Sequence, residues 1–154
     1  CLVGSEMCIR DSHNYLREHN VPWQVEDLTG AHVQVKQLEH ELNQRLKSSE
    51  APELICSVFA VGSELIADAL VSANKAGEVM VIGNDLFPES ALALRRGIFT
   101  NIVYKDPVSL AYRGAKTLGD YLLWGKTPAE PVQKGAVEMV FASNVDRYCE
   151  LAGI

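Results

Sequence analysis

The stretch LICSVFAVGSELIADALVSANKAGEVMVIGND, residues 54–85, decides the fold. It opens with a continuous apolar run over 54–61, which is typical of a β-strand covered on both faces. Ser63 is placed to cap a helix that Gly77 ends. A second buried strand over 79–82 completes a strand–helix–strand unit, which predicts two parallel strands joined by a crossover helix. The inward face of that helix is formed by apolar residues at helical spacing: Leu65, Ile66, Ala69, Leu70 and Ala73.

The same alternation of strand and helix extends in both directions and predicts an α/β fold, a single three-layer α/β/α lobe with a largely parallel sheet. Upstream, we expect a helix over 13–20, a strand over 23–28 and an amphipathic helix over 33–47 with its apolar stripe at Val35, Leu38, Leu42 and Leu46. Downstream, we expect a helix from Pro88 to Gly97, a strand over 100–104, a helix over 107–124 stopped by Gly125, a strand over 136–142 and a helix over 145–152.

Residues 1–12, CLVGSEMCIRDS, show neither strand alternation nor a clear helical stripe. Leu2 to Asp11 match the translation of a transposon sequencing adapter, CTC GTG GGC TCG GAG ATG TGT ATA AGA GAC, which would place Ser12 at the junction. We therefore expect residues 1–12 to be an adapter-derived artefact that takes no part in the fold. The alternative is a natural, poorly structured N-terminus.

Charge and composition exclude some classes of partner. The net charge is −6, from 14 basic and 20 acidic residues, and the chain holds no basic cluster. Such a chain is a poor binder of the phosphate backbone, so we expect no contact of this segment with nucleic acid. No apolar run approaches the ~20 residues that span a bilayer. Outside 1–12 the cysteines are Cys56 and Cys149, which suit a reducing compartment and form no metal motif.

The segment VIGNDLFPES, 81–90, places Asn84 and Asp85 just after a buried strand. In open α/β sheets, small ligands bind in the crevice at the carboxyl ends of the strands. A carboxylate there can accept hydrogen bonds from sugar hydroxyls. The alternative is that Asp85 only caps the next helix, and position alone does not separate the two.

Two further strand ends carry candidate residues. In VYKDP, 103–107, Lys105 follows a strand and can donate to a ligand, but spacing favours a solvated lysine with Asp106 as the helix cap. In AVGSEL, 60–65, Gly62 and Ser63 can offer backbone N–H groups to a polar ligand, and a plain cap is the alternative.

No catalytic or metal motif accompanies these strand ends. His32 and His40 are too far apart in sequence to share one ion on a helix, and His13 and His19 lie on another element. No serine stands in a nucleophile motif. We therefore expect no cofactor and no metal, and an α/β enzyme is the least favoured of the functions considered.

Four segments, taken in order, resemble the sugar-binding domain of the LacI family and the related type I periplasmic sugar-binding proteins. HNYLREHNV (13–21) is similar to the helix after the Arg-x-x-Gly-Phe of that family, and VIGNDLFPES (81–90) to its Val-Val-Gly-Tyr-Asp-Asp segment. FTNIVYKDPVSLAYRGAKTLGDYLL (99–123) resembles its Leu-Thr-Thr-Ile-x-Gln-Asp segment with the following helix. VFASN (140–144) is similar to a VFxSN that a subgroup of bacterial regulators and sugar binders carries near the end.

The resemblance implies a fold of two α/β lobes with the ligand between them. Residues 13–154 would be most of the second lobe, with the first lobe and any DNA-binding headpiece missing. Asp85 would bind hydroxyls, and Lys105 stands where the family commonly has Gln. Gly62 and Ser63 stand where it has Asn-Asp, and His32 lies in a loop that often supplies an aromatic ring.

The function implied is the sugar- or polyol-binding domain of a LacI-type transcriptional regulator. Ligand would close the cleft and change the affinity of a cytoplasmic homodimer for DNA, which the missing headpiece would contact. The alternative is the periplasmic binding component of an ABC sugar importer.

Overall fold

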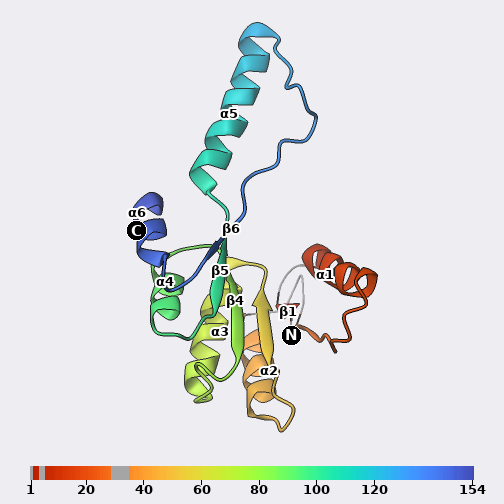
Figure 1. The fold of residues 1–154 in the computed structure, drawn as a ribbon, viewed down its shortest axis with the longest axis vertical. Coiled ribbons are helices and arrows are strands. Elements are labelled where there is room, and N and C mark those ends of the chain that lie inside the picture. Colours follow the sequence, from red (N-terminus) through yellow and green to blue (C-terminus); the bar gives the residue numbers. More distant parts are fainter. Residues whose placement is uncertain (1, 4–5, 29–34) are drawn as a thin grey trace.

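The computed structural model describes residues 2–3, 6–28 and 35–154. Within them, the strands form one sheet in the order β2-β1-β3-β4-β5-β6 (Figure 1). Neighbouring strands are parallel except β5 and β6, which are antiparallel. The strands are β1 (Leu2–Val3), β2 (Asp27–Leu28), β3 (Leu54–Ser57), β4 (Met80–Asn84), β5 (Asn101–Tyr104) and β6 (Glu138–Val140).

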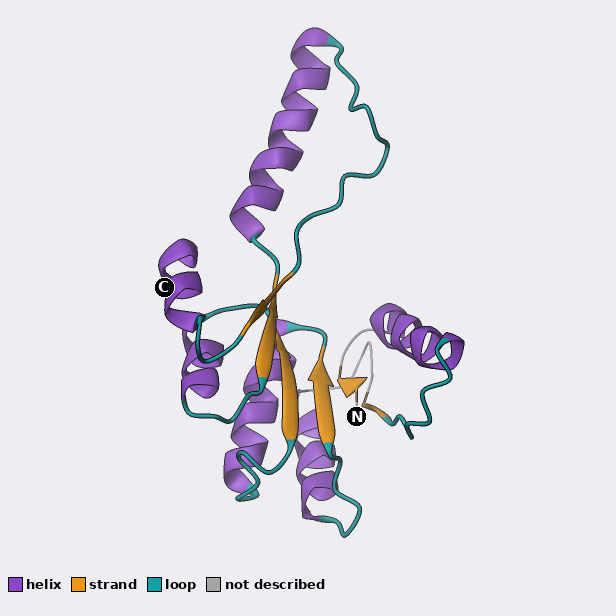
Figure 2. Cartoon of the chain, in the orientation of Figure 1, coloured by secondary structure: helices purple, strands orange, loops and turns teal. Residues whose placement is uncertain are grey.

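Helices alternate with the strands, as the sequence predicts (Figure 2). Contacts join α2 to α3, α3 to α4, and α4 to α6 in one row. The helices are α1 (Glu6–Glu18), α2 (Val35–Lys47), α3 (Ala60–Ser72), α4 (Pro88–Arg95), α5 (Pro107–Trp124) and α6 (Val145–Ala152). We call the sheet with α2, α3, α4 and α6 the body of the molecule.

The core lies between the sheet and this row of helices. The predicted stripe of α2 is confirmed at Leu38, Leu42 and Leu46, which are all buried. The buried part of α3 includes Ile66 and Leu70, which lie in the same core as strand residues such as Val81 and Ile102. Burying a branched aliphatic side chain contributes about 1.5–3 kcal/mol, so these residues account for much of the stability of the body.

The passage from β3 to α3 differs from the prediction. The strand ends at Ser57 and the helix begins at Ala60, so the strand predicted over 54–61 is too long. Phe59 occupies the N-cap position, and Ser63 lies inside the helix. The apolar run continues without a break from the strand into the first helical turn, so hydrophobicity alone does not mark the boundary. Gly77 also lies beyond the end of α3, at Ser72.

The N-terminal residues are regular where we expected no structure. Leu2 and Val3 form a strand between β2 and β3, and α1 begins at Glu6 instead of residue 13. Two residues are too few for alternation to show, and their pairing uses the backbone. In α1, Ile9 is only 4% exposed, so at least one residue of the N-terminal segment is buried, which the sequence did not indicate. The adapter origin of these residues stays a prediction.

The helix α5 has the bounds that the sequence predicts. The Asp106 carboxylate accepts hydrogen bonds from the N–H groups of Val108 and Ser109, and Gly125 ends the helix with φ 64°. Together with the return segment 125–137, α5 extends away from the sheet (Figure 1). We call α5 and 125–137 the arm. Inside it, the Leu110 side chain packs so closely against Gly135 that a Cβ there would lie 2.5 Å from Leu110 Cδ2.

Candidate functional site

Three polar residues meet at the carboxyl edge of β4 and β5. Asn84 ends β4, Asp85 follows it, and Lys105 directly follows β5. The Nζ of Lys105 lies 3.1 Å from Oδ1 of Asp85 and donates to Oδ1 of Asn84 at 3.0 Å. The Nδ2 of Asn84 donates to Oδ2 of Asp85 at 3.0 Å, which closes the triangle. The convergence that the strand ends predict is therefore confirmed for these residues.

The backbone of Asp85 directs its carboxylate into this triangle. Its φ is 64°, in the left-handed region that Asp and Asn tolerate better than most residues. Its N–H donates to the carbonyl of Val103 at 3.0 Å, which holds the turn against β5.

The alternative in which Asp85 caps α4 is wrong. Phe87 occupies the N-cap position of that helix, and its N–H donates to Oγ of Ser90. The Ser90 hydroxyl in turn donates to the carbonyl of Asp85. The N–H group of Phe87 at the start of α4 is thus bonded to a serine of the same helix, and Pro88 at the first helical position has no N–H group that needs a partner. The Asp85 carboxylate remains available for other partners.

The triangle combines exposed and buried members. The side chains of Asp85 and Lys105 are 41% and 39% exposed, so both keep surface for a ligand. The prediction of a merely solvated Lys105 is wrong, because its ammonium turns back to β4. The predicted cap by Asp106 is confirmed. Asn84 is only 6% exposed and uses both ends of its amide within the triangle, so it orients the other two side chains.

Ser63 and Gly62 lie beneath the edge and do not present groups to solvent. Ser63 is fully buried, and its Oγ accepts from the N–H of Asn84 at 3.0 Å and donates to the Asn84 carbonyl at 3.3 Å. We therefore correct the prediction that Ser63 contacts a ligand: it holds the tip of β4 in place. A Cβ on Gly62 would lie 2.8 Å from Cε1 of Phe59, so glycine permits the ring to pack there.

One residue near this edge was missed from the sequence. Phe59 lies between the end of β3 and the start of α3, and its ring is partly buried against the core. The sequence hid it inside an apolar run that we assigned wholly to a strand. His32, the remaining candidate, lies outside the described residues.

A second group of polar side chains lies where β5 and β6 pair, around Tyr104, the residue before Lys105. The Tyr148 hydroxyl donates to the Glu138 carboxylate, and this bond raises the pKa of Tyr148. Tyr104 packs edge-on against Tyr148, with ring centroids 5.5 Å apart. Burial raises the pKa of Tyr104, and the carboxylates of Asp106 and Glu138 add to that effect.

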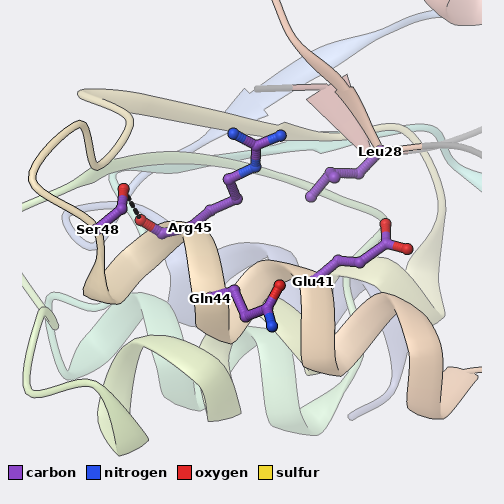
Figure 3. A pocket seen from close by; sticks show the side chains of 5 residues that line it. All are labelled: Leu28, Glu41, Gln44, Arg45 and Ser48. Carbon is purple, nitrogen blue, oxygen red and sulfur yellow. Dashed lines mark hydrogen bonds between the residues drawn. The ribbon is translucent and has the colours of Figure 1, made fainter.

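A hollow of about 280 Å³ lies away from the triangle, between β2 and α2 (Figure 3). None of the candidate residues lines it, and Arg45, which does, already forms an ion pair with Glu26. The hollow is lined by Leu28, Glu41, Gln44, Arg45 and Ser48.

Over 2–3, 6–28 and 35–154, no group of three or more His, Cys, Asp or Glu side chains is placed to hold a metal ion. In the same ranges, no helix has both the length and the apolar character needed to cross a bilayer.

Residues 14–127 match the family described as the periplasmic binding protein domain. The chain belongs to this family. The match covers most of the chain, including the Asn84–Asp85–Lys105 triangle. The predicted α/β fold of the type I periplasmic binding proteins is thereby confirmed for a partial lobe with a mostly parallel sheet.

Solved structures of other proteins share the fold at low sequence identity. A glucose-galactose binding protein from Geobacillus stearothermophilus is 15% identical, with a TM-score of 0.77 over 93% of this chain and 52% of its own. A carbohydrate transporter solute binding protein from Agrobacterium radiobacter, in complex with D-arabinose, is 16% identical, with a TM-score of 0.79 over 98% and 53%. A protein assigned as a LacI transcriptional regulator from Bacteroides fragilis is 19% identical, with a TM-score of 0.66 over 88% and 46%.

The periplasmic binding protein domain described here therefore spans about half the length of these similar structures. No curated protein is similar enough in sequence to count as a match.

Proposed function

We propose that this periplasmic binding protein domain is one lobe of a protein that binds a sugar or another polyol. The observation that carries the proposal is the Asn84–Asp85–Lys105 triangle at the carboxyl edge of the sheet. Asp85 would accept hydrogen bonds from ligand hydroxyls, and Lys105 would donate to a ligand oxygen. A charge-assisted hydrogen bond of this kind contributes about 1.5–3 kcal/mol. Two of the similar structures are described as complexes with D-arabinose and with tagatopyranose, which supports this class of ligand.

The exposed arm supports the proposal that residues 13–154 are the C-terminal part of a two-lobe domain. No residue of α5 is buried, although the helix carries large apolar side chains. A helix with an exposed apolar face normally packs against another element. A first lobe encoded upstream would provide that surface and the other wall of the ligand site. The exposed apolar residues of the arm include Tyr112, Leu118, Tyr121, Leu122, Leu123, Trp124 and Val132.

We propose further that the intact protein is a cytoplasmic LacI-type regulator. Ligand binding would close the two lobes of a homodimer and change its affinity for DNA, which an N-terminal headpiece would contact. Such coupling is typically 1–3 kcal/mol and requires a ligand that distinguishes the two lobe arrangements. The similarity to a LacI regulator of known structure is consistent with this setting.

The second candidate setting is the binding component of an ABC sugar importer in the periplasm. It is favoured by the similarity to sugar transport proteins, including a periplasmic ribose ABC transporter from Conexibacter woesei with a TM-score of 0.76. Sequencing the gene upstream of codon 13 separates the two settings. A helix-turn-helix segment supports the regulator, and a signal peptide supports the importer.

The binding proposal is tested by calorimetry on the two-lobe protein encoded by the complete gene, with a panel of pentoses and hexoses. We expect Asp85→Ala to weaken binding by at least tenfold. Asp85→Asn is the sharper variant, because Asn tolerates the left-handed backbone and removes only the charge. A matched control is Asp146→Asn, which breaks the exposed Arg95–Asp146 ion pair away from the triangle.

Unchanged affinity in Asp85→Asn would refute the site, and an equal loss in Asp146→Asn would show a general effect of lost charge. The proposal assigns binding and no catalytic step. Chemical conversion of any sugar by the purified protein would contradict it.

A further inference from the structure

The passage from β3 to α3 lies at the same edge of the sheet as the triangle. The strands β3 and β4 pair in parallel, with Cys56 opposite Ile82, so the chain leaves both strands at one edge (Figure 1). The first turn of α3 touches the tip of β4 directly, because Oγ of Ser63 accepts from the N–H of Asn84 at 3.0 Å. A ligand held by Asp85, the next residue, therefore has residues 58–62 beside it.

The two polar side chains of this passage are already bonded. The Ser57 hydroxyl donates to the carbonyl of Phe59 at 2.7 Å, and Ser57 is only 2% exposed. Ser63 is fully buried and bonds to the backbone of Asn84. Residues 58–62 are Val, Phe, Ala, Val and Gly. Among residues 57–63, all of which the structure describes, no side chain is therefore left to pair with a ligand hydroxyl.

Phe59 and Val61 give this part of the edge an apolar surface, which we call the apolar wall. A Cβ on Gly62 would lie 2.8 Å from Cε1 of Phe59, so the ring occupies the space that another side chain at 62 would fill. Val61 is 47% exposed in the first turn of α3. On the β4 side, Leu86 and Phe87 are apolar and partly exposed as well. The candidate site thus has a charged part at the triangle and an apolar part next to it.

We infer that the site prefers a sugar with one apolar end, a 6-deoxyhexose in its pyranose form, an inference that rests on the proposed function. The ring hydroxyls would bond to Asp85 and Lys105, and the methyl group at C6 would contact the apolar wall. A hexose carries a hydroxyl at C6, for which residues 57–63 offer no side-chain partner. Burying a hydroxyl without a partner lowers affinity by about five- to a hundredfold, whereas burying a methyl group is favourable.

The test is calorimetry on the two-lobe protein encoded by the complete gene, with pairs of sugars that differ only at C6. D-fucose is compared with D-galactose, and 6-deoxy-D-glucose with D-glucose. In at least one pair, we expect the deoxy sugar to bind about fivefold or more tightly than its parent hexose, because one unpaired hydroxyl costs at least that much affinity.

Variants of α3 show whether the apolar wall sets this ratio of affinities. Val61→Thr adds a hydroxyl that can pair with the C6 hydroxyl of the parent hexose, so it should reduce the ratio by about two- to tenfold. The matched control is Val71→Thr, the same change at a side chain that is 58% exposed near the other end of the helix. It should leave the ratio unchanged. Asp85→Asn should weaken the binding of both sugars and leave the ratio as it is.

The outcomes separate this inference from the proposed function. Equal or tighter binding of both parent hexoses would overturn the preference, although the protein would still be a sugar binder. Binding of pentoses without any of these four sugars would have the same meaning. An unchanged ratio in Val61→Thr, or an equal change in Val71→Thr, would also overturn the inference. Failure to bind any sugar would refute the proposed function itself.

Discussion

The helices α3 and α5 show two different ways in which this chain stabilises a helix. The helix α3 has no side-chain cap at its N-terminus, but it buries residues such as Ile66 and Leu70 in the core. The longer α5 has no buried residue, but it has an aspartate cap, a proline in its first turn and a left-handed glycine at its end. Capping is local in sequence, whereas burial depends on the partners that the fold supplies. The body thus holds its helices by packing, and the arm holds its helix by local signals.

The largest expected effect contrasts side-chain truncation in the two helices. Ile66 is fully buried, and Ile66→Ala should lower the free energy of unfolding by about 2–5 kcal/mol. Leu122 is 71% exposed, and Leu122→Ala should change it by no more than about 0.5 kcal/mol. Urea unfolding of the 154-residue chain measures both. Similar losses for the two variants would mean that the arm is packed in solution.

A glycine-to-alanine change should have opposite signs in the two regions. A Cβ on Gly83 in β4 would lie 2.8 Å from Cε2 of the buried Phe99 ring, so Gly83→Ala should destabilise the body by about 1–3 kcal/mol. A Cβ on Gly119 in α5 would have no neighbouring atom within 4 Å outside the backbone of its own helix, so Gly119→Ala should stabilise that helix by about 0.5–1 kcal/mol. Urea unfolding reports the first, and the helical signal in circular dichroism the second. A loss of helix in Gly119→Ala would contradict the open surroundings of α5.

The smallest effect concerns the pH dependence of the arm. The Ser109 hydroxyl and N–H, which bond to the Asp106 carboxylate, lower the pKa of that group below its ordinary value of 3.8. The cap is therefore fully present above that value and is lost as the pH falls through the lowered pKa of the folded state. We expect amide exchange at Val108 and Ser109 to accelerate in that range.

Asp106→Asn is the control for this prediction, because asparagine caps helices about as well as aspartate and does not titrate. Exchange in this variant should be independent of pH in the same range, after correction for the intrinsic rate. A persistent acid-dependent acceleration would assign the effect to another group.

The contrast between the regions also explains how much of the fold was predictable. The bounds of α5 were correct because its start signals, Asp106 and Pro107, and its end signal, Gly125, are adjacent to the helix in sequence. The end of β3 was wrong because an apolar run suits both a buried strand and a buried helical turn, and only tertiary contacts decide between them. The strand at Leu2–Val3 was missed because its pairing uses backbone groups, which leave no mark in a two-residue sequence.

The candidate site was predictable in position but not in the division of labour among its residues. Parallel strands end at one edge, so the meeting of Asn84, Asp85 and Lys105 follows from topology. Which side chain remains exposed does not follow, because burial depends on neighbours distant in sequence. Asn84 is buried and orients its neighbours, and Ser63 is a buried residue whose hydroxyl bonds to the backbone of Asn84. Asp85 does not cap α4, because Ser90 bonds to the N–H of Phe87 at the start of that helix.

Residues 105–106 join β5 to the long helix α5, so a small rotation there is amplified along the helix. A helix of 18 residues is about 27 Å long. A rotation of about 10° at Lys105 would therefore carry Trp124 through roughly 5 Å, which follows from the rise per residue. A small angular change thus becomes, at the far end of α5, a displacement about as wide as the spacing between two strands.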